Sequence, residues 1–225
     1  MSVSASRAPQ LIFEQIRTGG DRNFGYLLGD RDARQGVLID PSYAPEVLAA
    51  RARDQDLHIV LILNTHGHPD HVNGNAAAVE LTGAKIAAYS TSPIKPSVPL
   101  VDGQELGVGA LRLRVLCTPG HCDDHVVFYE PSARVLITGD LLFVGKVGGT
   151  NGDSDARVEW DSLQRLVTGI PDDCTVWPGH DYGARPSSTM AWEKKTNPFL
   201  CCPDLEAFLQ LKREWPAFKK RYGLK

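Results

Sequence analysis

The sequence predicts an α/β (α+β) protein built as an αββα sandwich, with two mixed sheets in the middle and helices on the outer faces. Two observations predict this architecture. Short apolar runs typical of buried strands form one group before residue 90 and a second group after residue 110. Helical patterns follow strands in both groups, and each helix must bury its apolar stripe against a sheet.

The first group of strands is expected at residues 11–13, 24–28, 37–39, 59–63 and 85–89. A helix is expected over residues 46–55, with Pro45 in its first turn, where proline is well tolerated. A second helix is expected over residues 76–81, and Gly83 ends it. Residues 90–99 contain three prolines and are expected to form a loop.

The second group of strands is expected at residues 111–117, 125–129, 135–138 and 175–177. Residues 141–157 are rich in glycine and polar side chains, and loops of this length are often functional. A helical stripe follows at Trp160, Leu163 and Leu166. Beyond Pro203 the pattern predicts another helix, interrupted near Pro216.

Length and composition indicate one domain over residues 1–225, with a short helical extension at about residues 185–225. The formal charge of −3 argues against nucleic acid or an anionic membrane as a partner. No apolar run approaches the ~20 residues of a membrane span. The first seven residues lack the apolar core of a secretion signal, and the five cysteines show no paired spacing. The expected location is therefore the cytoplasm.

Three histidines and an aspartate crowd into six residues directly after the apolar run 59–63. They are His66, His68, Asp70 and His71. Residues two apart in extended backbone project to the same side, so His66 and His68 can converge on one point. Pro69 ends the extended segment, and Asp70 and His71 can begin a helix that faces the same hollow. This crowding of imidazoles and a carboxylate indicates a metal site.

Three more strands end in a glycine followed by a side chain that can bind metal, namely His121, Asp140 and His180. A single histidine at a strand end is more often a packed or surface residue than a ligand. The repeated pattern is harder to explain by packing, because five of the seven histidines lie in these clusters. Histidine and carboxylate donors without cysteine suit zinc or iron.

This seven-residue set resembles the ligand set of the metallo-β-lactamase superfamily, whose fold is the αββα sandwich expected above. The similarity covers about residues 10–200. Within the superfamily the chain most resembles the glyoxalase II (hydroxyacylglutathione hydrolase) branch and the related persulfide dioxygenases. The closer similarity is carried by residues 139–145, 178–182 and 196–199.

The resemblance implies two divalent metal ions, with Zn²⁺ favoured and iron or manganese as alternatives. One metal would lie on His66, His68 and His121. The second would lie on Asp70, His71 and His180, with Asp140 bridging the two. Asp70 and His71 would also be the catalytic residues. The implied enzyme is a metallo-hydrolase that uses a metal-bound hydroxide to cleave a small-molecule thioester such as an S-acylglutathione.

Substrate contacts are expected at Tyr182, which matches a glyoxalase II tyrosine near glutathione, and at Lys146. The family's Cys-Gly-Lys-Phe-Tyr-like loop is absent, however, and Lys146 lies nearer Asp140 than the family lysine does. The basic residues 219–221 are possible substitutes for missing glutathione contacts, although a solvated tail accounts for them more simply.

The alternative is an iron-dependent persulfide dioxygenase, with a single Fe²⁺ on His66, His121 and Asp140. That branch's Gly-Arg-Thr-Asp-Phe-like loop is missing, and Phe199 stands where its arginine is expected. A lactonase, another ester or amide hydrolase, and a non-catalytic metal-binding module are further alternatives. The oligomeric state stays open, with a homodimer as one option. Asp124 and His125 are expected at the surface.

Overall fold

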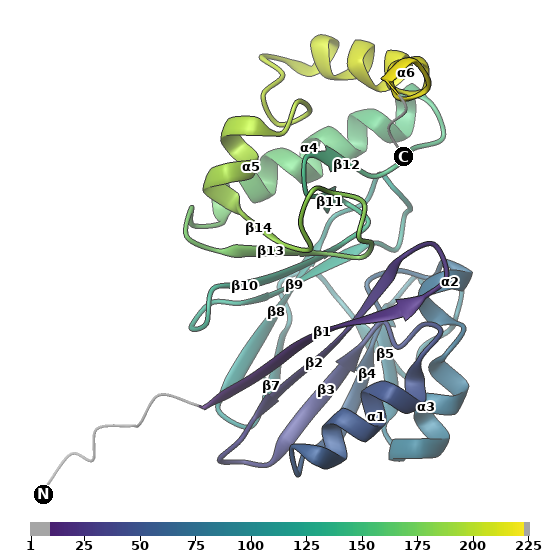
Figure 1. Cartoon of the computed structure of the whole chain (residues 1–225), viewed down its shortest axis with the longest axis vertical. Helices are drawn as coiled ribbons and strands as arrows, with labels where there is room; N and C mark the ends of the chain where they lie inside the picture. Colours follow the sequence, from purple (N-terminus) through teal and green to yellow (C-terminus); the bar gives the residue numbers. More distant parts are fainter. Residues whose placement is uncertain (1–9, 223–225) are drawn as a thin grey trace, which may run out of the picture.

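The computed structural model describes residues 10–222 and places two six-stranded sheets face to face. The start of the chain, where no secretion signal is expected, lies outside the described residues. Helices cover the outer face of each sheet, as Figure 1 shows. The αββα sandwich expected from the sequence is confirmed.

The first sheet has the strand order β1-β2-β3-β4-β5-β6. β1 to β3 pair antiparallel, and β3 to β6 pair parallel, so the sheet is mixed. Its strands are β1 (Leu11–Gly19), β2 (Asn23–Asp30), β3 (Gln35–Ile39), β4 (His58–Leu63), β5 (Lys85–Tyr89) and β6 (Val98–Leu100). Its helices are α1 (Pro45–Asp54), α2 (Pro69–Val72) and α3 (Asn75–Thr82).

The second sheet has the order β14-β13-β10-β9-β8-β7, and only its β10–β13 pair is parallel. Its strands are β7 (Glu105–Val108), β8 (Leu111–Cys117), β9 (Val126–Glu130), β10 (Val135–Gly139), β13 (Thr175–Pro178) and β14 (Ser188–Thr189). The hairpin β11 (Leu142–Phe143) and β12 (Lys146–Val147) follows β10. The helices α4 (Asp153–Gly169), α5 (Met190–Thr196) and α6 (Leu205–Tyr222) lie over this sheet, at the upper end of Figure 1.

Three apolar clusters hold the four layers together. The central cluster lies between the sheets and includes Tyr26 from β2 and Phe128 from β9. Leu48 of α1 packs with Ile62 of β4 on the outer face of the first sheet. On the other side, helical residues such as Phe208 pack against the outer face of the second sheet. Burial of this apolar surface is the main stabilising contribution to such a sandwich.

Three sequence expectations for the elements are wrong in detail. Residues 98–100 form strand β6 rather than a loop, and Pro99 is tolerated because β6 is an edge strand and needs no donor on its free side. The stretch 141–157 contains the β11–β12 hairpin and the start of α4. Helix α6 runs through Pro216 without the expected interruption. Among residues 10–222, no helix is long and apolar enough to cross a bilayer.

Backbone hydrogen bonds join the two sheets beside the clusters of candidate ligands. The N–H of Val126 donates to the carbonyl of Thr65 at 2.8 Å, and the N–H of Phe24 donates to that of Gly179, also at 2.8 Å. The loops after β4 and β13 are thereby fixed to the opposite sheet. Residues far apart in the sequence meet at this edge of the sandwich.

Candidate metal centre

The segment after β4 brings His66 and His68 together as the sequence predicts. His66 is fully buried, and its Nε2 lies 3.0 Å from Nδ1 of His68. His68 is the residue before α2, and Pro69 occupies the first turn of that helix. The extended backbone of His68 therefore leads into the helix that carries the next two candidate ligands.

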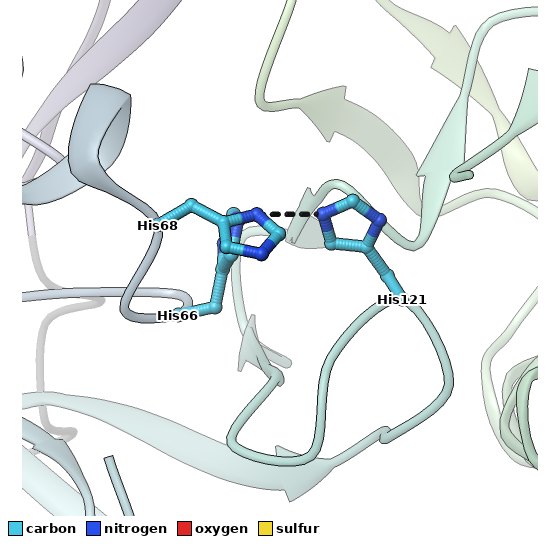
Figure 2. Close-up of side chains that lie close together, drawn as sticks. All are labelled: His66, His68 and His121. Atoms are coloured by element: carbon cyan, nitrogen blue, oxygen red, sulfur yellow. Dashed lines mark hydrogen bonds between the residues drawn. The ribbon is translucent and has the colours of Figure 1, made fainter. Parts of the chain in front are cut away.

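His121 reaches the same point from the loop after β8. Its Nε2 lies 3.0 Å from His68 Nδ1, and Figure 2 shows the three imidazoles facing one another. The ligand atoms of His66, His68 and His121 all lie within 4.8 Å of one another. We call these three residues the first triad.

A second triad consists of Asp70, His71 and His180, whose ligand atoms also lie within 4.8 Å of one another. The Nε2 atoms of the two histidines are 3.3 Å apart. The Oδ2 atom of Asp70 lies 3.4 Å from Nε2 of His180 and 3.7 Å from Nε2 of His71. The first sheet supplies two members through α2, and β13 of the second sheet supplies the third.

Asp140 follows β10 and lies between the triads. Its Oδ2 is 3.7 Å from His121 Nε2 in the first triad and 3.2 Å from His180 Nε2 in the second. Its Oδ1 is 3.4 Å from His71 Nε2. Within residues 10–222, this buried Oδ1 has no hydrogen-bond partner of good geometry. A buried carboxylate oxygen left in this way fits a site that receives a cation.

Backbone carbonyls fix the orientation of two candidate ligand histidines. Nδ1 of His121 donates to the carbonyl of Gly149 at 2.8 Å, and Nδ1 of His180 donates to that of Asp21 at 2.9 Å. Because each Nδ1 carries the proton, each Nε2 presents its lone pair to the centre. This is the tautomer that a metal ligand needs.

Asp40 orients two further candidate ligands, His71 directly and His66 through Thr65. Its Oδ2 accepts a 3.0 Å hydrogen bond from His71 Nδ1 and a 2.6 Å bond from the Thr65 hydroxyl. Since that hydroxyl donates to Asp40, it accepts from Nδ1 of His66 at 3.1 Å. Both rings therefore also direct Nε2 toward the centre. Unprotonated imidazole nitrogens this close together repel one another unless a proton or a metal cation lies between them.

The electrostatics of the cluster divide the histidines into two groups. Burial lowers the pKa of His66 well below its ordinary value and lowers the pKa of His121 as well. Burial also opposes protonation of His71, but the nearby carboxylates of Asp140 and Asp40 raise its pKa well above the usual range. Burial of Asp140 is outweighed by His71 and His180, which hold its pKa well below normal. The centre thus favours an ionised carboxylate.

The donor set of the two triads and Asp140 fits two divalent cations. Each triad offers three nitrogen or oxygen donors, and the shared carboxylate adds one more to either side. Three protein donors with a further open position are typical of catalytic rather than structural sites. The structure brings together all seven residues that the sequence analysis named.

A cavity of about 560 Å³ lies beside the centre and is lined by His121 and Asp140. Its walls come from the β11–β12 hairpin, the start of α4, the loop after β13, and α6. The lining includes the aromatic residues Phe143, Tyr182, Phe199 and Trp215. Its charged residues are the cations Arg22, Lys146, Lys212, Arg213 and Lys219 and the carboxylates Asp21, Asp140 and Asp153. Because the cations outnumber the carboxylates, a small molecule with anionic groups suits such a cavity.

Lys146 and Tyr182, the two expected substrate contacts, lie against each other in this cavity. Nζ of Lys146 is 3.9 Å from the centre of the Tyr182 ring, and the ring stacks on His180 with centroids 4.6 Å apart. The Tyr182 hydroxyl donates to the Asp21 carboxylate at 2.6 Å. Burial, aided by nearby Lys219 and Arg22, lowers the pKa of Lys146 to about 8.

A family model described as the metallo-beta-lactamase superfamily matches residues 18–92 and 88–180. The chain belongs to this superfamily. The resemblance stated from the sequence motifs is thereby confirmed.

The chain is similar in sequence or in structure to several named proteins. It is 36% identical over 164 residues to the hydroxyacylglutathione hydrolase of Francisella tularensis subsp. novicida (strain U112), covering 72% of this chain and 64% of the relative. It therefore spans a little under two thirds of that relative's length. ETHE1 from Myxococcus xanthus is 32% identical with a TM-score of 0.83, covering 91% of each chain. TTHA1623 in a di-iron-bound form is 32% identical with a TM-score of 0.69, covering 83% of this chain and 100% of that one.

The surface position expected for Asp124 and His125 is wrong, because both residues are buried. Nε2 of His125 accepts a 3.1 Å hydrogen bond from the backbone N–H of Asp140, and Nδ1 donates to the Thr118 hydroxyl at 2.9 Å. Burial and the neighbouring His121 lower the pKa of His125 to about 3, so the ring stays neutral and can accept. The apolar residues after His125 in β9 were a usable sign of its burial.

The contribution of α6 to the cavity was missed in the sequence. Lys219, which the pattern favoured as part of a solvated tail, lines the cavity, and so do Lys212 and Trp215. These residues look like an ordinary amphipathic helix when only spacing is considered. No local motif indicates which cavity the helix borders.

Proposed function

We propose that the chain is a metal-dependent hydrolase that cleaves a small-molecule thioester such as an S-acylglutathione, using two divalent cations. The observation that carries the proposal is the pair of three-donor triads with Asp140 between them. We assign His66, His68 and His121 to one cation and Asp70, His71 and His180 to the other. Zn²⁺ is the favoured metal, since the donors are imidazoles and carboxylates without cysteine. Iron and manganese accept the same donors.

Two cations held by the triads would supply a deprotonated water near neutral pH and polarise the substrate carbonyl. The chain's own residues position these groups. Asp140 contacts both triads and would help to hold both cations. Asp70 accepts a 2.9 Å hydrogen bond from Asn23 and lies at the exposed side of the second triad. Tyr182, Lys146 and Arg22 would bind the anionic thiol carrier along the cavity wall.

Relatives support both parts of the proposal. Hydroxyacylglutathione hydrolase is the name of the curated relative at 36% identity, which favours a thioester substrate. TTHA1623 was solved in a di-iron-bound form, which favours two metals and keeps iron as a candidate. We further propose that the described chain works as one domain in the cytoplasm, with the region beyond about residue 185 completing the cavity.

The second candidate is a persulfide dioxygenase. ETHE1 is a protein of that class, and its match to this chain extends over 91% of both chains. Its single iron would use His66, His121 and Asp140. Among residues 10–222, the compact donor groups combine Asp140 with His66 and His71 instead. This arrangement, together with the complete second triad, favours the hydrolase.

One preparation tests both candidates. The purified protein would be assayed for bound metal, for hydrolysis of S-lactoylglutathione and a lactone, and for oxygen uptake with glutathione persulfide. Two metal equivalents with thioester hydrolysis support the proposal. One iron equivalent with oxygen uptake would contradict the hydrolase and support the dioxygenase. Preferential hydrolysis of the lactone would show that the substrate is a lactone rather than a thioester.

His68→Ala separates the two candidates further. His68 belongs to the first triad but not to the three-residue iron set of the dioxygenase. In the hydrolase its loss should remove one metal equivalent and most activity. A variant that keeps full metal content and oxygen uptake would contradict the two-metal assignment.

A further inference from the structure

We infer that Lys212 of α6 and Glu159 of α4 form a positioning pair for His121, so that the docking of α6 controls how tightly the first triad holds its metal. The inference rests on the proposed assignment of His121 as a ligand. Neither residue belongs to a triad, and neither is indicated by a motif in the sequence.

The pair is buried and closely bonded. Nζ of Lys212 donates to Oε2 of Glu159 at 2.6 Å, and their side chains are 11% and 0% exposed. Within residues 10–222, the second oxygen of Glu159 has no hydrogen-bond partner. A fully buried carboxylate is costly unless it is paired, so Glu159 depends on the lysine. The ion pair fixes the position of the Lys212 side chain in the cavity wall.

Lys212 also bonds to the segment that orients His121. Its Nζ donates to the carbonyl of Gly148 at 2.6 Å, and the next carbonyl, that of Gly149, accepts from His121 Nδ1 at 2.8 Å. Gly148 itself is tightly enclosed, because a Cβ there would overlap the carbonyl oxygen of Asp140 and lie 3.1 Å from His121 Nδ1. A shift of this segment would therefore move the hydrogen bond that fixes the His121 ring.

The backbone of Glu159 packs against Gly120, the residue before His121. A Cβ on Gly120 would overlap the backbone of Glu159. Gly120 also has a φ of 133°, which side chains rarely adopt. His121 is thus held between α4, through Gly120, and the Gly148–Gly149 segment. Lys212 is the side chain that joins these two supports.

Metal affinity measured without substrate tests the inference. Metal-free protein would be titrated with Zn²⁺ against a competing chelator, and His121→Ala would identify the binding step that belongs to the first triad. In Lys212→Met, we expect that step to weaken about tenfold, the lower end of what outer partners of metal ligands cost. The step of the second triad should stay within about twofold.

Two further variants exclude a general loss of stability. Arg213→Met removes the neighbouring α6–α4 ion pair with Asp153, which is half exposed and far less costly to break, and it should leave both binding steps unchanged. The double variant Glu159→Leu/Lys212→Met replaces the buried charges with apolar side chains, an exchange that is often neutral for stability. It should fold and still bind the first metal more weakly, because the bond to Gly148 is lost.

The outcomes separate this inference from the proposed function. Wild-type protein that binds no metal would overturn the proposed function itself. Wild-type protein with two metals and a double variant with unchanged affinity would overturn only the positioning pair. Equal weakening of both steps, or the same loss in Arg213→Met, would also overturn it, since a general effect of α6 docking would then suffice.

Discussion

The two ends of the cavity are built by different means. At the metal end, every candidate ligand comes from a loop or short helix that follows a strand, and outer hydrogen bonds fix four of the imidazoles. At the other end, the wall includes a two-stranded hairpin and α6. Its cations contact both aromatic rings and carboxylates, as Lys146 does with Tyr182 and Lys212 with Glu159. The first end contains the candidate metal ligands. The second end lines the cavity, and because a fold alone does not determine function, its side chains should decide which substrate binds.

The largest effect should follow from changing Asp140, the carboxylate between the two triads. Asp140→Asn keeps the size of the side chain but removes the charge shared by the triads. We expect loss of at least one metal equivalent and a fall in hydrolysis well beyond the ~10–100-fold cost of an outer partner. Metal analysis and kcat would measure both. Asp181→Asn is the matched control, since this carboxylate follows His180 but pairs outward with Arg17. Equal losses in the two variants would contradict the role of Asp140.

A smaller effect at the same end should follow from Asp40→Asn. The amide nitrogen would face either the backbone N–H of Thr65, which now donates to Oδ1, or the two donors at Oδ2, so at least one bond must be lost. In either orientation His71 loses its ionised acceptor. We expect metal affinity at the second triad to fall about 10–100-fold, as for other partners that orient ligand histidines. Competition with a chelator would measure the change. Unchanged affinity would show that burial alone orients His71.

At the substrate end, Lys146→Gln should raise KM several-fold and leave metal content unchanged. The lysine loses its charge as pH rises through its lowered pKa of about 8, so KM of the wild-type protein should rise over the same interval. KM of the variant should not follow pH in this way. Initial rates between pH 6.5 and 9.5 would show the difference. Parallel curves for both proteins would exclude Lys146 from substrate binding.

The smallest effect concerns stability rather than activity. Burial raises the pKa of Glu159 from 4.5 to about 7, although Lys212 opposes the shift. The folded protein therefore binds more protons than the unfolded chain between these values, and the free energy of unfolding falls as pH rises through that window, by up to roughly 3 kcal/mol. Glu159→Gln should flatten this decline in urea unfolding between pH 4.5 and 7.5. An unchanged slope would mean that other groups cause it.

The meeting of the seven candidate ligands could be predicted from the sequence because the signals for it are local. The ligands lie next to apolar strands with short, sharp turns, and strands in one sheet bring their ends to a common edge. The division of His66, His68 and His121 from the other ligands followed from family resemblance. The partners of these ligands did not follow, since Asp21, Asp40 and Gly149 are remote in sequence and carry no motif.

The substrate end could not be predicted in the same way. A helix such as α6 shows only its apolar stripe, and the stripe does not reveal that Lys212 faces a buried glutamate. His125 was misplaced for a related reason. A single polar residue beside a strand is often exposed, whereas both ring nitrogens of the buried His125 are hydrogen-bonded, one to the Asp140 N–H and one to the Thr118 hydroxyl.

The ligands come from both sheets, and this has a consequence beyond catalysis. His66, His68, Asp70 and His71 belong to the first half of the chain, whereas His121, Asp140 and His180 belong to the second. Bound cations would act as cross-links between the halves, and their binding energy would count toward folding. Thermal denaturation should then depend on free metal concentration, and the protein should be less stable in a cell that is short of metal.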